Sequence, residues 1–490
     1  MTFEIVFVLL SLLGMMAALI ADKMRPGMVL FSVVVLFLCV GILTPKEMLE
    51  GFSNKGMITV ALLFLVSEGI RQSGTLGQVI KKLLPQGKTT VFKAQLRILP
   101  SVAFISAFLN NTPVVVIFAP IIKHWAKSVK LPATKFLIPL SYVTILGGIC
   151  TLIGTSTNLV VHGMILEAGY EGFTMFELGK VGIFIAIAGI IYLFIFSKRL
   201  LPDARPDTAV PDEEVEEGEK LHRVEAVLGA RFPGINKKLS DFNFQRHYGA
   251  EVKEIKTRNG QRYVDHLEDV VLREGDTLVV MADDTFIPTW GESSVFVLLT
   301  NGNDPDTSGK KKRWLALILL VLMIVGATVG ELPATKEMFP DIKLDMFFFV
   351  CITTIIMAWT NIFPARKYTK YISWDILITI ACAFAISKAM VNSGVADCVA
   401  GFIIGLSDDY GPHVLLAILF VITNLFTELI TNNAAAALAF PLALSISAQL
   451  GVSPTPFFVV ICMAASASFS TPIGYQTNLI VQGIGNYKFT

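Results

Sequence analysis

The sequence predicts an all-α polytopic membrane protein with two inverted repeats, re-entrant hairpins and broken helices, plus one small α+β cytosolic domain. Three observations predict this fold class: an apolar composition, one polar insert between two apolar blocks, and motifs that recur once along the chain. Of the 490 residues, 53% are hydrophobic and 16% are charged, whereas soluble domains carry about 25% charged residues. The composition therefore indicates lipid as the solvent for most of the chain.

Several apolar segments approach the length of about 20 helical residues that crosses a bilayer. They are residues 3–21, 28–44, 179–197, 314–330 and 344–359. The first segment has no basic leader and no small-residue cleavage site before Asp22, so we expect a retained helix rather than a signal peptide. The six cysteines lie in apolar stretches without metal-ligand spacing, and we interpret them as packing residues.

A soluble insert divides the two membrane blocks. The predicted domains are a first membrane repeat (1–197), a linker and regulatory domain (198–313, with its core at about 220–285) and a second membrane repeat (314–490). Basic residues stand at both junctions with the membrane, at 198–199 and at 310–313. Because cytoplasmic loops carry an excess of Lys and Arg near the ends of spans, we expect the insert to be cytoplasmic.

Short alternating segments within the insert predict a β-sheet. They are residues 222–228, 250–255 and 277–281, with turn signals at 258–260 and 274–276. In residues 223–229, 233–239, 248–249 and 272–280 the insert resembles the C-terminal ligand-binding module of TrkA-type potassium-transport regulators. The resemblance implies a small regulatory ligand, sometimes a nucleotide, and pairing as a dimer. The sequence shows no phosphate-cradling glycine loop here, so the identity of the ligand stays open.

Motifs that recur about 320 residues apart locate the candidate site. The matching pairs are 151–163 (TLIGTSTNLVVHG) with 471–483 (TPIGYQTNLIVQG), Asn110-Asn111-Thr112 with Thr431-Asn432-Asn433, and Ser73-Gly74 with Ser393-Gly394. Three matches at one spacing indicate a duplicated unit. Interrupted apolar segments at corresponding positions of two halves are the best sequence pointer to the binding site of a secondary transporter.

Each Asn-containing triplet interrupts an apolar run, and polar groups inside a membrane need partners or a watery cavity. We expect two half-length helices that meet at a tip, where free N–H groups and the partial positive charge of helix starts suit an anion. The predicted substrate-binding residues are Asn110, Asn111, Thr112, Thr155, Thr431, Asn432, Asn433 and Gln476. A single intramembrane Asn or Thr more often joins helices by hydrogen bonds, but the duplication favours a site.

Glycine breaks in the second motif suit a cation. They would let the chain leave the helix and free backbone carbonyls for sodium, with one site in each repeat. The predicted sodium ligands are Gly154, Thr157, Asn158, Gly474, Thr477 and Asn478. Two bound cations would nearly cancel the charge of a divalent anion and so lower the cost of moving the loaded site through a low-dielectric barrier.

These residues resemble the divalent-anion/sodium symporter family, which contains sodium–dicarboxylate and sodium–sulfate cotransporters. Its Ser-Asn-Thr triplet at two hairpin tips is matched by 110–112 and 431–433. The resemblance implies that these triplets contact the anion, that Asn111 and Asn432 also lie near sodium, and that a homodimer works in the cell membrane by an elevator motion. Dicarboxylate members carry Pro-Pro-Asn where this chain has residues 156–158 (STN) and 476–478 (QTN). Together with the insert, this departure resembles the subgroup associated with sulfate or related oxyanions.

The leading hypothesis is a sodium-coupled importer of a divalent anion, with a sulfate-like oxyanion favoured and with lipid and a second copy as partners. The alternatives are a sodium–dicarboxylate cotransporter, a ligand-gated ion channel and an anion sensor. No selectivity-filter repeat supports the channel, and no nucleophile elbow, phosphate-binding loop or zinc spacing supports an enzyme. No nucleic-acid partner is expected. In the first copy the span 179–197 follows residues 172–174 (GFT), whereas the chain ends at 488–490 (KFT). We therefore expect the second copy to lack its last helix, and we favour truncation of the sequence.

Overall fold

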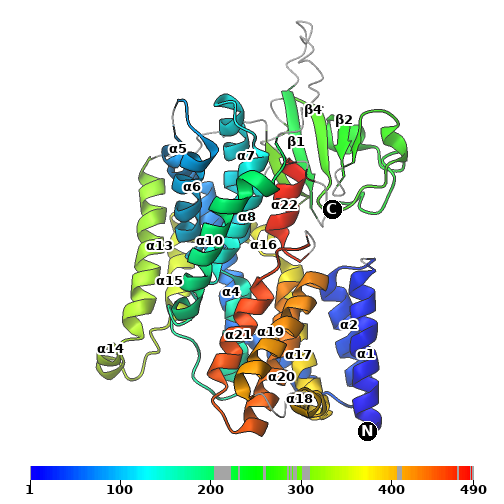
Figure 1. Cartoon of the computed structure of the whole chain (residues 1–490), viewed down its shortest axis with the longest axis vertical. Helices are drawn as coiled ribbons and strands as arrows, with labels where there is room; N and C mark the ends of the chain where they lie inside the picture. Colours follow the sequence, from blue (N-terminus) through cyan, green and yellow to red (C-terminus); the bar gives the residue numbers. More distant parts are fainter. Residues whose placement is uncertain are drawn as a thin grey trace, which may run out of the picture.

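A bundle of helices and one small sheet make up the protein in the computed structural model (Figure 1). The structure describes residues 2–21, 23–85, 87–203, 222–229, 232–257, 261–283, 286, 290, 295–300, 310–405, 411–471, 474–485 and 487. Within this part of the chain, seven helical segments are long and apolar enough to cross a membrane. They are Phe3–Ile20, Pro45–Gln72, Gly179–Leu200, Lys311–Gly330, Trp374–Asn392, Pro412–Leu429 and Asn432–Leu450.

The first membrane block contains ten α-helices in the residues that the structure describes. They are α1 (Phe3–Ile20), α2 (Pro26–Val40), α3 (Pro45–Glu50), α4 (Lys55–Gln72), α5 (Thr75–Leu83), α6 (Val91–Ser106), α7 (Asn111–Ser128), α8 (Thr134–Gly148), α9 (Ser156–Glu167) and α10 (Gly179–Leu200). The predicted span 28–44 is wrong at its end, because Gly41 adopts a left-handed φ of 82° and terminates α2 at Val40.

The insert forms the predicted sheet. It contains β1 (His222–Leu228), α11 (Phe244–Tyr248), β2 (Glu251–Lys256), β3 (Arg262–Tyr263), β4 (Thr277–Ala282) and β5 (Phe296–Thr300), with the antiparallel order β3-β2-β4-β1-β5. The three predicted strands are confirmed, whereas β3 and β5 were missed. The turn predicted at 274–276 has Gly275 at a φ of 84°. The other predicted turn, at 258–260, lies outside the described residues.

Ten α-helices of the described chain form the second membrane block. They are α13 (Lys310–Gly330), α14 (Pro333–Met338), α15 (Met346–Trp359), α16 (Tyr368–Tyr371), α17 (Trp374–Asn392), α18 (Val395–Gly405), α19 (Pro412–Leu429), α20 (Asn432–Leu450), α21 (Thr455–Ser466) and α22 (Gln476–Gly485). The predicted span 344–359 begins two residues too early. The helix starts at Met346, because the Asp345 side chain caps α15 by accepting the N–H of Phe348 at 3.2 Å.

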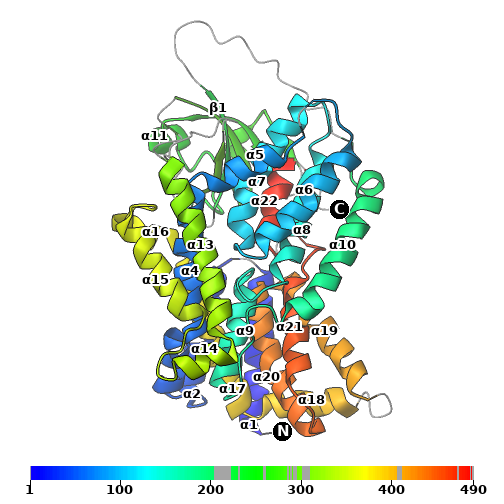
Figure 2. The ribbon, with the colours of Figure 1, turned by 90° about the vertical axis from the view of Figure 1, so that its left-hand side faces the viewer.

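Helix packing is reciprocal between the two blocks. α2 packs on α17 while its counterpart α15 packs on α4, and α7 packs on α22 while its counterpart α20 packs on α9. In Figure 1, α6, α7 and α8 lie in the upper half and α19, α20 and α21 in the lower half. Figure 2 shows α13 and α15 together on one flank and α10 on the opposite flank. Each block therefore completes the packing of the other.

The arms of the two hairpins are longer than the predicted half-length helices. α19 and α20 have 18 and 19 residues, and α6 and α7 have 16 and 18. The apolar runs continue on both sides of each tip, and Pro100, Pro120 and Pro441 are accommodated inside the helices. The prediction of a chain reversal at each Asn triplet is nevertheless met in the second block, where α19 and α20 pack along each other.

Candidate functional site

Four helices begin at the predicted motifs, and their first residues meet. α7 begins at Asn111, α9 at Ser156, α20 at Asn432 and α22 at Gln476. Asn433 Oδ1 accepts hydrogen bonds from Ser156 Oγ at 3.2 Å and Thr157 Oγ1 at 3.3 Å. Reciprocally, Thr112 Oγ1 donates to Gln476 Oε1 at 3.4 Å. These two contacts are counterparts under the repeat, and each joins the tip of one copy to the broken helix of the other.

Tyr475 lies at the centre of this junction. Its hydroxyl is 2.7 Å from the side-chain amide of Asn111 and 2.9 Å from Thr155 Oγ1, and it also interacts with the side chain of Asn432. Both tips therefore contact one phenol, and Asn111 and Asn432 lie at one junction. The sequence analysis overlooked Tyr475 and Ser156. Both could have been found from the repeat, because Tyr475 is the counterpart of Thr155 and Ser156 is the counterpart of Gln476.

The predicted substrate residues divide into buried and accessible ones. Asn111 is fully buried, and with its oxygen toward Tyr475 its nitrogen lies 2.8 Å from Ser106 Oγ, 3.1 Å from Thr144 O and 3.2 Å from Gly154 O. Its amide is thus occupied within the protein rather than free for an anion. Thr155 and Asn433 are also buried. The accessible or half-buried residues of the junction are Asn110, Thr112, Ser156, Thr431, Asn432 and Gln476.

The two glycine breaks share one hydrogen-bond pattern. Asn158 Nδ2 donates to Thr151 O at 2.8 Å and to Gly148 O at 3.4 Å. Asn478 Nδ2 donates to Ser468 O at 2.8 Å and to Thr471 O at 3.3 Å. Both amide nitrogens therefore bind backbone carbonyls that precede the glycine break, and each of these carbonyl oxygens has a second lone pair for another ligand.

Close approach of the backbone explains the glycines themselves. A Cβ on Gly154 would lie 2.4 Å from Gly148 O, and one on Gly474 would lie 2.0 Å from Ser468 Oγ. Gly154 does not adopt a positive φ. Glycine is thus needed here for space rather than for an unusual backbone conformation.

Acceptors at the first break fit a cation better than those at the second. Asn158 Oδ1 is buried and has no hydrogen-bond partner among the described residues. Its counterpart Asn478 Oδ1 accepts from Ser141 Oγ at 2.7 Å, and Ser141 Oγ also lies 2.9 Å from Thr477 Oγ1. An unpaired buried carbonyl oxygen is the type of ligand that a hard cation takes. Ser141 corresponds to Ile461 under the repeat, which explains the difference.

One carboxylate that the sequence analysis missed supports the second break. Glu428 precedes the second tip and accepts backbone N–H groups from Phe469 at 2.9 Å, Ser470 at 2.9 Å and Thr471 at 2.8 Å. Its counterpart in the first copy is Ala107. Because the repeat does not duplicate it, no pattern in the sequence pointed to Glu428.

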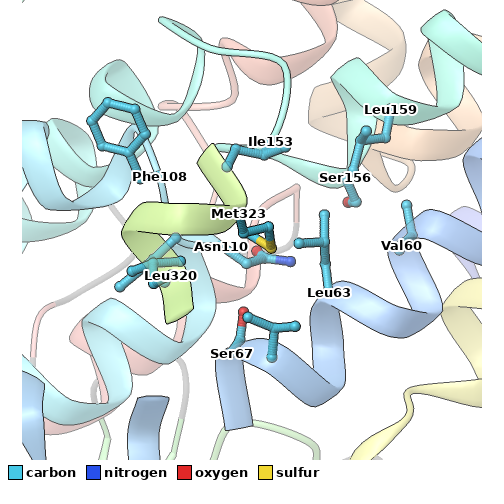
Figure 3. Close-up of a pocket in the computed structure, with 12 residues that line it drawn as sticks. Val60, Leu63, Ser67, Phe108, Asn110, Ile153, Ser156, Leu159, Leu320 and Met323 are labelled. Atoms are coloured by element: carbon cyan, nitrogen blue, oxygen red, sulfur yellow. The ribbon is translucent and has the colours of Figure 1, made fainter. Parts of the chain in front are cut away.

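A small cavity adjoins the junction (Figure 3). Asn110 and Ser156 line it together with Ser67 and Leu63 from α4 and Met323 from α13. Asn110 of the first tip, Ser156 of the first broken helix and Ser67 of α4 thus face a space whose other lining residues are apolar.

The fold and this junction define the class as a multi-span membrane transporter. A family model described as "citrate transporter" matches residues 16–444 and 338–490, and the chain belongs to this family. An uncharacterised transporter of Synechocystis sp. is 28% identical, over 94% of this chain and 88% of its own. Sodium/sulfate cotransporter 2 of Chlamydomonas reinhardtii is 30% identical, over 54% of this chain and 30% of its own. A sodium-dependent dicarboxylate transporter of Staphylococcus saprophyticus is 28% identical, over 24% of this chain and 23% of its own. The prediction of a membrane transporter of this type is confirmed at this level.

Proposed function

We propose that the protein imports a small divalent anion by sodium-coupled secondary transport, with a sulfate-like oxyanion favoured. The observation that carries the proposal is the meeting of four helix starts, two from each copy, at one junction with accessible amide and hydroxyl groups. Each helix start carries roughly half a positive charge and unpaired N–H groups. Four of them together attract a divalent anion without requiring a charged side chain.

Sodium is the proposed coupling ion. The unpaired Oδ1 of Asn158 supports a site at the first break, with Gly154 and Thr157 as neighbours and Asn111 next to them. The equivalent site would use Gly474, Thr477, Asn478 and Asn432, where Ser141 must turn away before Asn478 Oδ1 can bind an ion. The names of the sodium/sulfate cotransporters among the relatives also support sodium.

The mechanism we infer is an elevator motion in a homodimer built from inverted repeats. The reciprocal packing of α2, α17, α15 and α4 supports the duplication. The placement of α6–α8 and α19–α21 at opposite ends of the molecule in Figure 1 supports the inversion. We further propose that the insert is a cytoplasmic regulatory domain of the TrkA C-terminal type. A nucleotide remains the ligand class that this resemblance suggests.

A carboxylate is the second candidate substrate, favoured by the family description and by the name of the dicarboxylate relative. Uptake of labelled sulfate into proteoliposomes, with a sodium gradient and with choline in its place, tests the proposal. We expect uptake that needs sodium and that thiosulfate inhibits more than phosphate, succinate or citrate. Uptake indifferent to sodium would remove the coupling, and stronger inhibition by succinate or citrate would identify a carboxylate carrier.

A further inference from the structure

At one position of the junction, the two copies of the repeat carry different residues. The residue before the broken helix is Thr155 in the first copy and Tyr475 in the second. Thr155 is short, whereas the phenol of Tyr475 extends from the start of α22 to the tip of the other copy, where its hydroxyl meets Asn111 at 2.7 Å. Only 7% of Tyr475 is exposed. An aromatic ring therefore occupies the middle of a site that is otherwise built from small polar side chains.

We propose that Tyr475 determines the size of the transported anion, admitting a compact tetrahedral oxyanion and excluding an elongated dicarboxylate. This inference rests on the proposed function and names its substrate class. A dicarboxylate carries its charges at two ends of a carbon chain and needs polar contacts at two separated places. The ring fills space that such a molecule would need between the tips, while a tetrahedral ion requires only one cluster of donors.

The ring and the hydroxyl have separable roles. The hydroxyl connects Asn111, Thr155 and Asn432, so its loss should loosen the junction and weaken binding of every anion. The ring takes up volume, so its loss should change which anions fit. Tyr475→Phe removes only the hydroxyl, and Tyr475→Thr restores the residue type found in the first copy.

The experiment measures sulfate and succinate uptake by wild type, Tyr475→Phe and Tyr475→Thr in proteoliposomes. We expect Tyr475→Phe to lower kcat/KM for both anions with their ratio unchanged. We expect Tyr475→Thr to shift the ratio toward succinate by roughly tenfold or more, the range over which pocket size discriminates substrates. An unchanged ratio in Tyr475→Thr would overturn the inference, as would a wild type that moves both anions equally well.

Binding in detergent separates this inference from the proposed function. The shift in thermal unfolding temperature on adding sulfate or succinate reports affinity without requiring flux. If wild type moves neither anion into liposomes, the carrier function fails. The inference on Tyr475 then stands if Tyr475→Thr alone gains a succinate-dependent shift, and falls if it does not.

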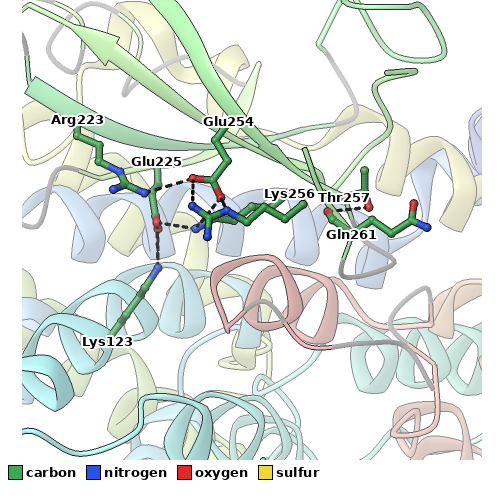
Figure 4. Close-up of polar contacts among 8 residues, drawn as sticks. Lys123, Arg223, Glu225, Glu254, Lys256, Thr257 and Gln261 are labelled. Carbon is green, nitrogen blue, oxygen red and sulfur yellow. Dashed lines mark hydrogen bonds and ion pairs between the residues drawn. The ribbon is translucent and has the colours of Figure 1, made fainter. Parts of the chain in front are cut away.

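A different set of contacts connects the insert to the same junction. Lys123 of α7 lies 2.8 Å and 3.0 Å from the two carboxylate oxygens of Glu225 in β1, and Lys256 of β2 lies 3.3 Å from the same carboxylate (Figure 4). The side chain of Glu225 is 17% exposed. The insert therefore binds α7 through a partly buried ion pair rather than a solvent-exposed one, which would contribute little.

The insert also packs tightly on α22. A Cβ on Gly275, in the turn before β4, would lie 2.5 Å from Leu479 Cγ, and a Cβ on Gly483 would lie 2.8 Å from Thr277 Oγ1. Leu479 and Gly483 are four residues apart and share one face of α22. The insert thus contacts both helices whose first residues meet at Asn111 and Tyr475.

We infer that docking of the insert on α7 and α22 sets the affinity of the anion site by fixing how these two helices meet. The inference rests on the proposed function for its substrate. Lys123→Met breaks the contact with α7 while Lys256 still neutralises Glu225, so the insert keeps its own fold. Lys127→Met is the matched control, because Lys127 is exposed on the same helix.

Hydrogen exchange at the starts of α7 and α22, measured together with sulfate uptake, tests whether docking of the insert sets the affinity of the anion site. In Lys123→Met we expect faster amide exchange at residues 111–115 and 476–482 and a KM for sulfate raised about fivefold, the lower end of typical coupling between sites. Lys127→Met should match wild type in both. Exchange that stays at the wild-type rate, or faster exchange with unchanged KM, would overturn the inference. If wild type shows no flux, the carrier function fails, and the exchange at the two helix starts still decides whether docking reaches the junction.

Discussion

Substitution of Glu428 by Gln removes the negative charge that binds the backbone of residues 469–471, just before the glycine break at Gly474. The shape of the side chain stays nearly the same. Glu428 Oε1 accepts the N–H groups of Phe469 and Ser470, and Oε2 accepts the N–H of Thr471 at 2.8 Å. A Gln side chain keeps one acceptor oxygen, and its NH₂ group faces N–H groups that it cannot pair. Hydrogen bonds to charged groups contribute roughly 1.5–3 kcal/mol each, and water can partly replace them because the three N–H groups are half-buried or exposed. We therefore expect a loss of about 2 kcal/mol in the local stability of segment 468–471.

Hydrogen exchange of the purified protein measures this local stability. We expect exchange at 468–471 and 474–478 to become faster by roughly 30-fold, which corresponds to about 2 kcal/mol. The KM for sulfate should rise, because Asn478 is held by carbonyls of segment 468–471. Glu331→Gln is the matched control, since Glu331 accepts one backbone N–H, from Met175 at 2.9 Å, away from the junction. Wild-type exchange and KM in Glu428→Gln would refute the reasoning.

Three further predictions follow from the same contacts. Gly154→Ala should abolish uptake and lower thermal stability, because its Cβ would meet Gly148 O at 2.4 Å; Gly169→Ala, in an open turn with nothing within 4 Å of the added Cβ, should keep uptake and at most lose the small amount that a left-handed φ costs. Ser141→Ala frees Asn478 Oδ1 and should lower the sodium concentration that gives half-maximal uptake, a change that unaltered sodium dependence would contradict. Burial raises the pKa of the Glu225 carboxyl, but Lys123 and Lys256 outweigh it and lower the pKa from 4.5 to about 2. The stabilisation from this depressed pKa is complete above about pH 4.5 and is lost as the pH falls toward 2. Hydrogen exchange of strand β1 should therefore show Glu225→Gln to be less stable than wild type above about pH 4.5 and equally stable near pH 2.

Much of the architecture could be read from the sequence because the repeat and the hydropathy are properties of chain position. The offset of 320 residues paired Asn158 with Asn478, and the structure gives both the same hydrogen bonds to backbone carbonyls. Strand β1 matches the predicted residues 222–228. The lengths of the hairpin arms were wrong, because the Asn triplets mark where the chain turns but do not determine how far the helices continue on either side.

The roles of individual side chains were harder to predict, because a motif does not state which of its residues faces the space between the helices. Asn111 was one of the eight expected anion contacts, yet its amide is occupied by neighbouring groups in the structure. The Tyr475 hydroxyl contacts the tip of the other copy, whereas Glu428 accepts N–H groups of residues 469–471 within its own copy. Both residues differ from their counterparts, Thr155 and Ala107. A comparison of the two copies finds the residues that they share, so it does not identify functional residues that differ between them.

The position of a bound oxyanion tests the central claim most directly. A crystal structure with selenate, whose selenium gives an anomalous signal, would show where a sulfate-like ion binds. The account predicts a peak between the two tips, within hydrogen-bonding reach of Asn110, Ser156, Asn432 or Gln476. A peak elsewhere in the membrane region, with the four helix starts still joined through Tyr475, would contradict it.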